Sequence, residues 1–175
     1  MRPIRLAAVA GTLLLAMTAA CGSSPGSTTA TTGATPAMAV IPVAQRSPAG
    51  IPGKEPTVVV PTGQPPSALE YADLITGRGA AATARDTVTV QYVGYSWTNR
   101  KMFQASWTTG NGAPISFSLA GVIQGWSEGL VGMKVGGRRE LFIPPSLAYG
   151  ASPPVGSGIP ANDTLIFIVD LIKIG

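Results

Sequence analysis

The sequence contains no histidine, only one cysteine and few charged residues. Without histidine, no imidazole can act as a general acid or base or bind a metal. Cys21 has no second cysteine with which to form an intramolecular disulfide or a paired-thiol metal site. Charged residues make up 11% of the chain, against about a quarter in typical domains. Any chemistry of this chain must therefore proceed without imidazole, a thiol pair or a zinc ion held by either.

The formal net charge of +4 gives little support for nucleic-acid binding. Arg2 and Arg5 contribute to this charge and lie in a segment that we expect to be removed. The rest of the chain has no run of Lys and Arg, and no interleaving of basic and aromatic residues that would follow a phosphate backbone. We therefore expect no nucleic-acid partner.

Residues 1–21 have the three parts of a secretory signal peptide. Two arginines precede an apolar stretch from Leu6 to Met17, and small residues follow before Cys21. The stretch is shorter than the ~20 residues that span a bilayer, which disfavours a transmembrane helix. The end of the segment resembles the lipobox of bacterial lipoproteins, with Thr18 where that family usually has Leu. The resemblance implies lipidation of Cys21, and the alternative is cleavage nearby with release of a soluble protein.

The composition changes twice along the chain. Ser, Thr, Gly, Pro and Ala dominate residues 22–56, and such a composition buries too little apolar surface to offset chain entropy. From about Thr57 the pattern becomes apolar and β-branched. We therefore predict a signal peptide with a lipobox-like cysteine (1–21), a disordered linker (22–56) and a folded domain (57–175).

The folded domain has mainly strand patterns. The predicted strands are residues 57–60, 69–75, 87–97 with its continuation after a turn at 101–104, 115–119, 138–143 and 165–174. In the long strand 87–97, Val88, Val90 and Tyr92 fall on one face. Residues 165–174 are almost entirely apolar, which is typical of a central strand.

One helix is predicted, from Gln124 to Val131. Trp126, Leu130 and Val131 would form its apolar stripe, and Gly132 would end it. One short helix among five to six strands predicts an α+β domain. The simplest arrangement is a curled antiparallel sheet wrapped around the helix, which is too short to be stable alone.

The stretch from Val88 to Ile174 resembles the FK506-binding protein (FKBP) family. The matching segments occur in order and are VQYVGY (90–95), KMFQAS (101–106), PISFSL (114–119), GVIQGWSEGLVGMKVGGRRELFIPP (121–145), LAYG (147–150) and IPANDTLIFIVDLIKI (159–174). The resemblance implies the same sheet around one helix. It also implies peptidyl-prolyl cis-trans isomerase activity, which needs no cofactor and no metal.

The resemblance further implies a substrate pocket of aromatic and aliphatic side chains. The corresponding residues are Tyr92, Phe103, Gln104, Ile115, Val122, Ile123, Trp126, Tyr149, Ile159 and Phe167. By the resemblance, Trp126 forms the pocket floor, and the Tyr149 hydroxyl and Ile123 N–H are the catalytic hydrogen-bond donors. Gln104 stands where the family usually has Asp, and Ile115 where many members have Phe.

The resemblance implies proline-containing polypeptides as clients and macrolides of the FK506 and rapamycin class as inhibitors. With the N-terminal pattern, we expect an exported protein held on the outer side of the cell membrane by its lipid, or secreted if lipidation fails. We expect a monomer, since no sustained amphipathic helix argues for a dimer. Two alternatives remain open: a non-catalytic proline-binding or chaperone module, favoured by the uncharged Gln104, and a structural envelope lipoprotein with a relic domain.

Overall fold

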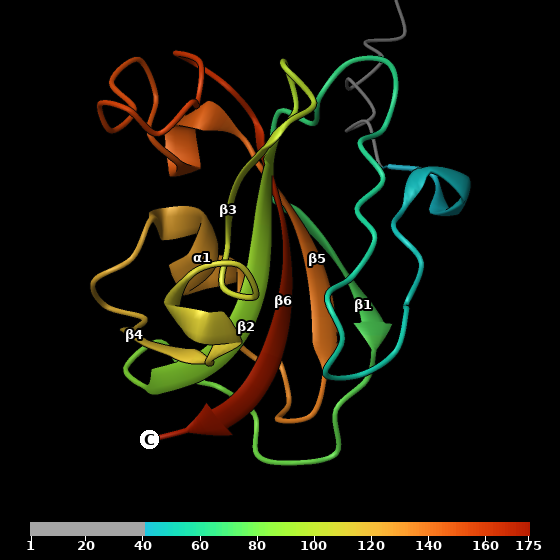
Figure 1. Cartoon of the computed structure of the whole chain (residues 1–175), viewed down its shortest axis with the longest axis vertical. Coiled ribbons are helices and arrows are strands. Elements are labelled where there is room, and N and C mark those ends of the chain that lie inside the picture. Colours follow the sequence, from blue (N-terminus) through green and yellow to red (C-terminus); the bar gives the residue numbers. More distant parts are fainter. Residues whose placement is uncertain (1–40) are drawn as a thin grey trace, which may run out of the picture. The chain divides into compact units, whose positions relative to one another are not determined.

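The computed structural model describes residues 41–175, which form an antiparallel β-sheet and one short α-helix (Figure 1). The predicted signal peptide, Cys21 and the first part of the expected linker lie outside these residues. The elements are β1 (Glu70–Ile75), β2 (Thr87–Ser96), β3 (Met102–Ala105), β4 (Ile115–Ser118), α1 (Gln124–Gly129), β5 (Arg138–Ile143) and β6 (Leu165–Ile174), with 3-10 turns η1 (Val43–Gln45), η2 (Gly110–Gly112) and η3 (Pro145–Leu147). No helix within 41–175 combines the length and the hydrophobicity that crossing a bilayer requires.

The strands are ordered β1-β5-β6-β2-β3, and β4 also pairs with β2. All pairings between these strands are antiparallel. This confirms the predicted fold class, and β5 and β6 begin and end at the predicted residues. Residues 57–60 are not a strand, although their β-branched side chains favour one, because they pair with no neighbouring strand.

Helix α1 packs directly on β5 because two glycines bring its backbone close. A Cβ atom at Gly125 would overlap the side chain of Ile143, and one at Gly129 would lie 2.7 Å from Leu141 Cδ2. Trp126 and Leu130 are buried, as predicted. The predicted helix end is wrong, because α1 stops at Gly129 and Val131 is 41% exposed. The chain turns away after Leu130, and the Gly132 N–H then donates to the Ala82 carbonyl instead of continuing the helix.

Both faces of the sheet are covered. Tyr92, Leu141 and Phe167 belong to the main core together with Trp126 of α1. Their neighbours along the strands, such as Phe142 and Ile168, belong to smaller clusters on the other face. Residues 165–171 are therefore all buried, which explains why β6 lacks the alternation of a strand with one face in water.

Residues 41–61, named here the N-terminal strap, cover the face of the sheet opposite α1 (Figure 1). Ile41 and Val60 are buried in one cluster with Trp97, Phe142 and Ile166. The Ile41 N–H also donates to the Glu70 carboxylate of β1 at 2.8 Å. Residues 41–56 fall in the expected linker, whereas the structure shows this part of the chain in contact with the sheet.

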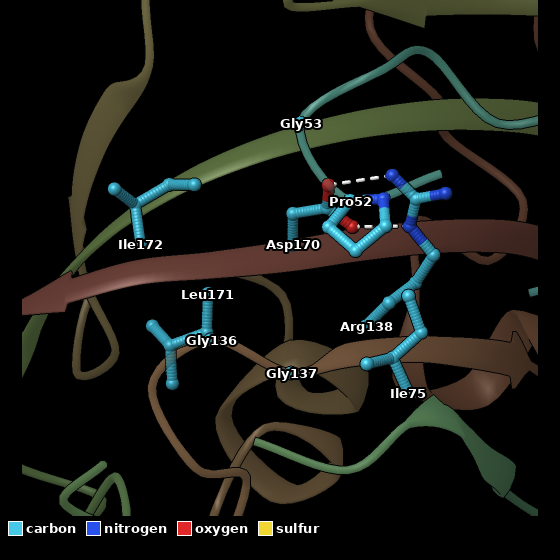
Figure 2. Close-up of a pocket in the computed structure, with 9 residues that line it drawn as sticks. All are labelled: Pro52, Gly53, Ile75, Gly136, Gly137, Arg138, Asp170, Leu171 and Ile172. Carbon is cyan, nitrogen blue, oxygen red and sulfur yellow. Dashed lines mark hydrogen bonds and ion pairs between the residues drawn. The ribbon is translucent and has the colours of Figure 1, made fainter. Parts of the chain in front are cut away.

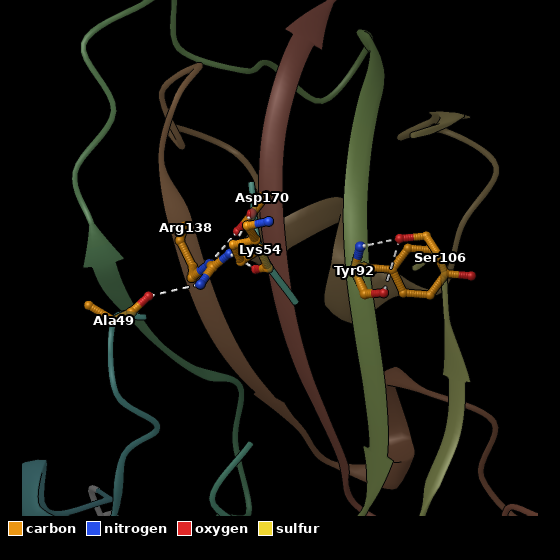
Figure 3. Close-up of polar contacts among 6 residues, drawn as sticks. All are labelled: Ala49, Lys54, Tyr92, Ser106, Arg138 and Asp170. Atoms are coloured by element: carbon orange, nitrogen blue, oxygen red, sulfur yellow. Dashed lines mark hydrogen bonds and ion pairs between the residues drawn. The ribbon is translucent and has the colours of Figure 1, made fainter. Parts of the chain in front are cut away.

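Polar side chains of β5 fasten the strap. Arg138 is 1% exposed and forms an ion pair with Asp170 of β6 at 2.5 Å, beside a cavity of about 80 Å³ that the strap helps to line (Figure 2). The same guanidinium donates to the carbonyls of Ala49 at 2.9 Å and Lys54 at 2.7 Å (Figure 3). Glu140, which is 0% exposed, accepts the Ser47 N–H at 3.1 Å. These contacts are mostly to backbone atoms of the strap, so its composition gave no sign of them.

Candidate active site

A cavity of about 310 Å³ opens between the sheet and α1. Its lining comes from β2, β3, β4 and β6, from α1 and the residues before it, and from the loop after η3. The lining residues are Tyr92, Phe103, Gln104, Phe117, Gly121, Val122, Ile123, Trp126, Tyr149 and Phe167. Because most of these side chains are aromatic or aliphatic, the cavity is an apolar cup with few polar groups.

Trp126 forms a rigid wall of this cavity. Three rings meet the indole edge to face: Tyr92 at 5.3 Å, Phe167 at 5.3 Å and Phe117 at 5.5 Å between centroids. Its buried Nε1–H has no hydrogen-bond partner among the described residues, so packing alone holds the ring. Only 4% of Trp126 is exposed, yet it lines the same cavity as Tyr149. The indole is therefore fixed in place and still within reach of a ligand that enters beside the phenol.

The polar groups of the lining residues include the Tyr149 hydroxyl, the Gln104 amide and the Ile123 backbone N–H. None of them has a hydrogen bond to another residue in the part of the chain that the structure describes. Ile123 is the N-cap of α1, so its N–H lies outside the helical hydrogen-bond ladder. Burial, and to a lesser extent the nearby Tyr149, raises the pKa of Tyr92. The Tyr92 hydroxyl therefore stays protonated in neutral solution, and the cavity offers donors without a permanent charge.

A buried network fixes the position of Tyr92. The Ser106 hydroxyl accepts the Tyr92 N–H at 2.8 Å (Figure 3), and the Ser106 N–H donates to the Tyr92 carbonyl at 2.9 Å. The same hydroxyl donates to the Gln91 side-chain oxygen, and Gln91 Nε2 donates to the Gly112 carbonyl at 2.6 Å. Ser106 is 0% exposed. Strand β2, the end of β3 and η2 are thereby tied together behind one wall of the cavity.

The structure brings most of the predicted site residues into this cavity. Ile159 instead lines a neighbouring cavity of about 410 Å³, which also contacts Phe103, Gln104 and Tyr149. Ile115 packs against the main core and lines neither cavity.

Two lining residues, Phe117 and Gly121, were not predicted. Phe117 follows Ile115 by two positions on the same face of β4, so the alternation of the strand would have found it. Gly121 has no side chain and leaves no such signal.

The donor set and the shape of the cavity define the class of ligand that the site can bind. Within residues 41–175, no three His, Cys, Asp or Glu side chains lie close enough together to hold a metal ion. The cup has aromatic walls, a fixed indole and uncharged donors among its lining residues. The fold and the site thus define a small α+β domain that binds a compact apolar ring flanked by hydrogen-bond acceptors.

The family follows from comparison with known proteins. The model of the FKBP-type peptidyl-prolyl cis-trans isomerase family matches residues 79–172. The chain belongs to this family and is an FKBP-type peptidyl-prolyl cis-trans isomerase. The proline ring of a substrate is the compact apolar group that such a pocket takes.

Bacterial relatives support the same conclusion. The chain is 45% identical over 123 residues to the FK506-binding protein of Streptomyces anulatus, which covers 69% of this chain and 98% of that protein. It is 47% identical over 107 residues to the isomerase FkpA of Escherichia coli K12, covering 61% of this chain and 37% of FkpA.

Two crystal structures show the fold at moderate similarity. The structure of FkpA from Escherichia coli superposes with a TM-score of 0.55 at 46% identity, covering 61% of this chain and 47% of that one. The structure of AtFKBP13 superposes with a TM-score of 0.54 at 32% identity, covering 61% of this chain and 93% of that one.

Proposed function

We propose that this isomerase acts outside the cytoplasm, held to the membrane by a lipid on Cys21, on proline-containing segments of exported polypeptides. The cavity between Trp126 and Tyr149 carries the proposal for the substrate. The signal-peptide pattern and the lipobox-like sequence before Cys21 support export and anchoring. Several acyl chains on one residue would bind a membrane far more firmly than one chain, since each buried methylene contributes ~0.8 kcal/mol.

The pocket suits a reaction that makes and breaks no bond. Rotation about a prolyl amide has a barrier of ~18–20 kcal/mol because resonance must be lost. The twisted amide is less polar than the planar one, so an apolar cup such as that around Trp126 favours it over the ground state relative to water. No nucleophile and no ionisable catalyst is required.

Oriented donors supply the rest of the stabilisation. The Tyr149 hydroxyl and the Ile123 N–H have no partner among the described residues, so both can bind carbonyl oxygens on either side of the prolyl bond. The Gln104 amide adds a third group that donates or accepts without charge. We assign the two catalytic donor roles to Tyr149 and Ile123, and a substrate-contact role to Gln104.

Macrolides of the FK506 and rapamycin class should bind in the same cavity and inhibit the enzyme. The names of the relatives from Streptomyces anulatus and Corynebacterium glutamicum describe FK506 binding by those proteins. The aromatic lining here, with Phe103, Trp126 and Phe167, offers the apolar contacts that a large hydrophobic ligand needs. Because Gln104 is neutral, replacing it with Asp should change macrolide affinity, and unchanged affinity and activity would reject a role for this position.

A proline-limited refolding assay tests the catalytic assignment. Removing the Tyr149 hydroxyl should lower kcat/KM about three- to tenfold, the cost of one uncharged hydrogen bond in the transition state. The variant is Tyr149→Phe, and the control is Tyr95→Phe, the same change at a tyrosine that does not line the cavity. Tyr95→Phe should keep the wild-type activity, and full activity in Tyr149→Phe would show that the assignment is wrong. Binding of proline peptides without any acceleration would favour the non-catalytic module.

Cell fractionation with intact-mass analysis tests the proposed export and lipid anchoring. The wild-type chain, expressed in a bacterial host, should appear in the membrane fraction with the mass of an acylated protein that begins at Cys21. Cys21→Ser should appear outside the cytoplasm without acyl mass. A wild-type chain found unprocessed in the cytoplasm would contradict export. Light scattering of the purified chain, expected to give the mass of a monomer, tests the oligomeric state.

A further inference from the structure

The turn between β2 and β3 is fastened on one side by Asp163, which lies two residues before β6. Asp163 is 4% exposed and accepts the Thr98 N–H at 3.0 Å and the Thr98 hydroxyl at 2.7 Å. It also accepts the Ser96 hydroxyl. Arg100 closes the turn in the left-handed region, with φ of 58°, and its N–H donates to the Ser96 carbonyl at 3.1 Å. The backbone of the turn is therefore tightly defined up to Arg100.

The Arg100 side chain fastens the same turn to the N-terminal strap. Its Nη2 donates to the Val60 carbonyl at 2.6 Å, and its Nη1 donates to the Pro61 carbonyl at 3.1 Å. Val60 is held in turn, because it is buried against Trp97 and Phe142. The guanidinium thus joins the turn to a point of the strap that cannot move without disrupting a packed cluster.

Strand β3, which follows this turn, has little to hold it in place. It is four residues long, and the named strand that it pairs with is β2. The pairing is interrupted between Gly94 and Tyr95, next to the turn. The Ser106 network holds the far end, and at the near end the Ser96 N–H donates to the Lys101 carbonyl at 3.0 Å, within the turn. Only Lys101 and Met102 separate Arg100 from Phe103, the residue that lines the cavity.

We propose that Arg100 is a positioning residue for the proline-binding cavity. Its side chain clamps the β2–β3 turn to the strap and so fixes the positions of Phe103 and Gln104. The proposal rests on the function proposed above. It makes the strap a working part of the enzyme, since the carbonyls that receive the guanidinium belong to Val60 and Pro61. The planar guanidinium of arginine can donate to two carbonyls at once, whereas the compact ammonium group of lysine reproduces this geometry only in part.

Three full-length variants separate this role from general stability. Arg100→Asn removes the clamp but keeps a residue that tolerates the left-handed region. Arg100→Lys keeps the charge and can reach one carbonyl. Lys101→Asn is the control, since it removes a charge from the same turn at a side chain with no hydrogen bond among the described residues. A cooperative urea transition is checked first for each variant.

We expect Arg100→Asn to raise KM for a proline peptide about three- to tenfold, with kcat changed less than about twofold. Arg100→Lys should fall between it and the wild type, and Lys101→Asn should match the wild type. The ring centroids of Phe103 and Phe167 lie 5.6 Å apart in the wild type. If Phe103 moves in Arg100→Asn, nuclear Overhauser contacts between the two rings should weaken.

Unchanged ring contacts in Arg100→Asn overturn the proposal whatever the activity. Altered contacts with an unchanged KM also overturn it, because the cavity would then tolerate the movement. If Arg100→Asn does not fold, the ring contacts and the KM of Arg100→Lys test the proposal instead. Should the wild type show no isomerase activity, the proposed function fails, and the ring contacts still test the clamp by themselves.

Discussion

Gly94 lies under the two rings that form one side of the cavity, and a single methyl group there should disturb both. A Cβ atom at this position would lie 2.6 Å from Phe103 Cζ and 2.9 Å from Phe167 Cε1. Gly94 is within β2 and is not among the residues with positive φ. Gly94→Ala therefore tests the contact with the rings, without a conformational penalty on the backbone.

The expected losses of stability and activity depend on which of the two rings can move. Distances below 3.0 Å are essentially never seen for real Cβ atoms, so at least one ring must move. Phe167 is 4% exposed on a central strand, whereas Phe103 lies on the short strand β3 and is only partly buried. We expect Phe103 to move outward, at a cost of about 2 kcal/mol of stability, a typical value for overpacking by one methyl group. The displaced wall should lower kcat/KM by about tenfold, which corresponds to about 1.4 kcal/mol.

Urea unfolding and the proline-limited refolding assay measure the two effects separately. The matched variant is Gly94→Ala with Phe103→Leu, in which the shorter side chain lacks the ring atoms that overlap the new methyl group. Stability should recover relative to the expectation for two additive changes, since the residues are in contact. Activity should not recover, because the aromatic wall is lost.

A Gly94→Ala protein as stable and as active as the wild type would refute this reasoning. Strictly additive losses of stability in the double variant would refute it too, because they would show that the methyl group and the Phe103 ring do not compete for the same space.

Two further predictions concern buried carboxylates away from the cavity. Burial raises the pKa of Glu140, although hydrogen bonds from Ser47 and the charge of Arg46 oppose this in part. A carboxyl whose pKa is higher in the folded state binds its proton more tightly there, so the fold loses stability as pH rises from the ordinary glutamate pKa to the raised one. Glu140→Gln should remove this loss of stability. In urea unfolding between about pH 4 and pH 8, the stability of this variant relative to the wild type should therefore rise with pH. A difference that stays constant over this range would contradict the prediction. Asp163→Ala should lower stability by about 3 kcal/mol, because it leaves the Ser96 and Thr98 donors without their acceptor; a loss in urea unfolding below about 1 kcal/mol would mean that water replaces the carboxylate.

The strands and most of the cavity could be predicted because their signals are local. Alternation placed Val88, Val90 and Tyr92 on one face, and all three are in the main core. The end of α1 was missed because Val131 continues the apolar pattern, whereas the helix stops at Gly129 and the Gly132 N–H bonds to the distant Ala82 carbonyl. No window of sequence around residue 131 contains that information.

The strap was missed for a related reason, although a hint was present. A strand as apolar as residues 165–174 needs cover on both faces, and one short helix covers only one. That requirement predicts a second covering segment without naming it. Apart from the buried Ile41, residues 41–56 gave little sign of the role, because they are held mainly through backbone atoms that any sequence possesses, as in the bonds from Arg138 to the Ala49 and Lys54 carbonyls.

The way the strap is fastened also bears on how the chain acquires its native state. Ser47 and Glu140 are 93 positions apart in the sequence, and Ala49 and Arg138 are 89 apart. Contacts of such separation slow folding, because a large loop must close before they form. A chain that emerges from its N-terminus onward would present the strap first and its docking site almost last. The outer face of the sheet would therefore stay uncovered until the final strand is in place, and this enzyme would itself be vulnerable to aggregation in that interval.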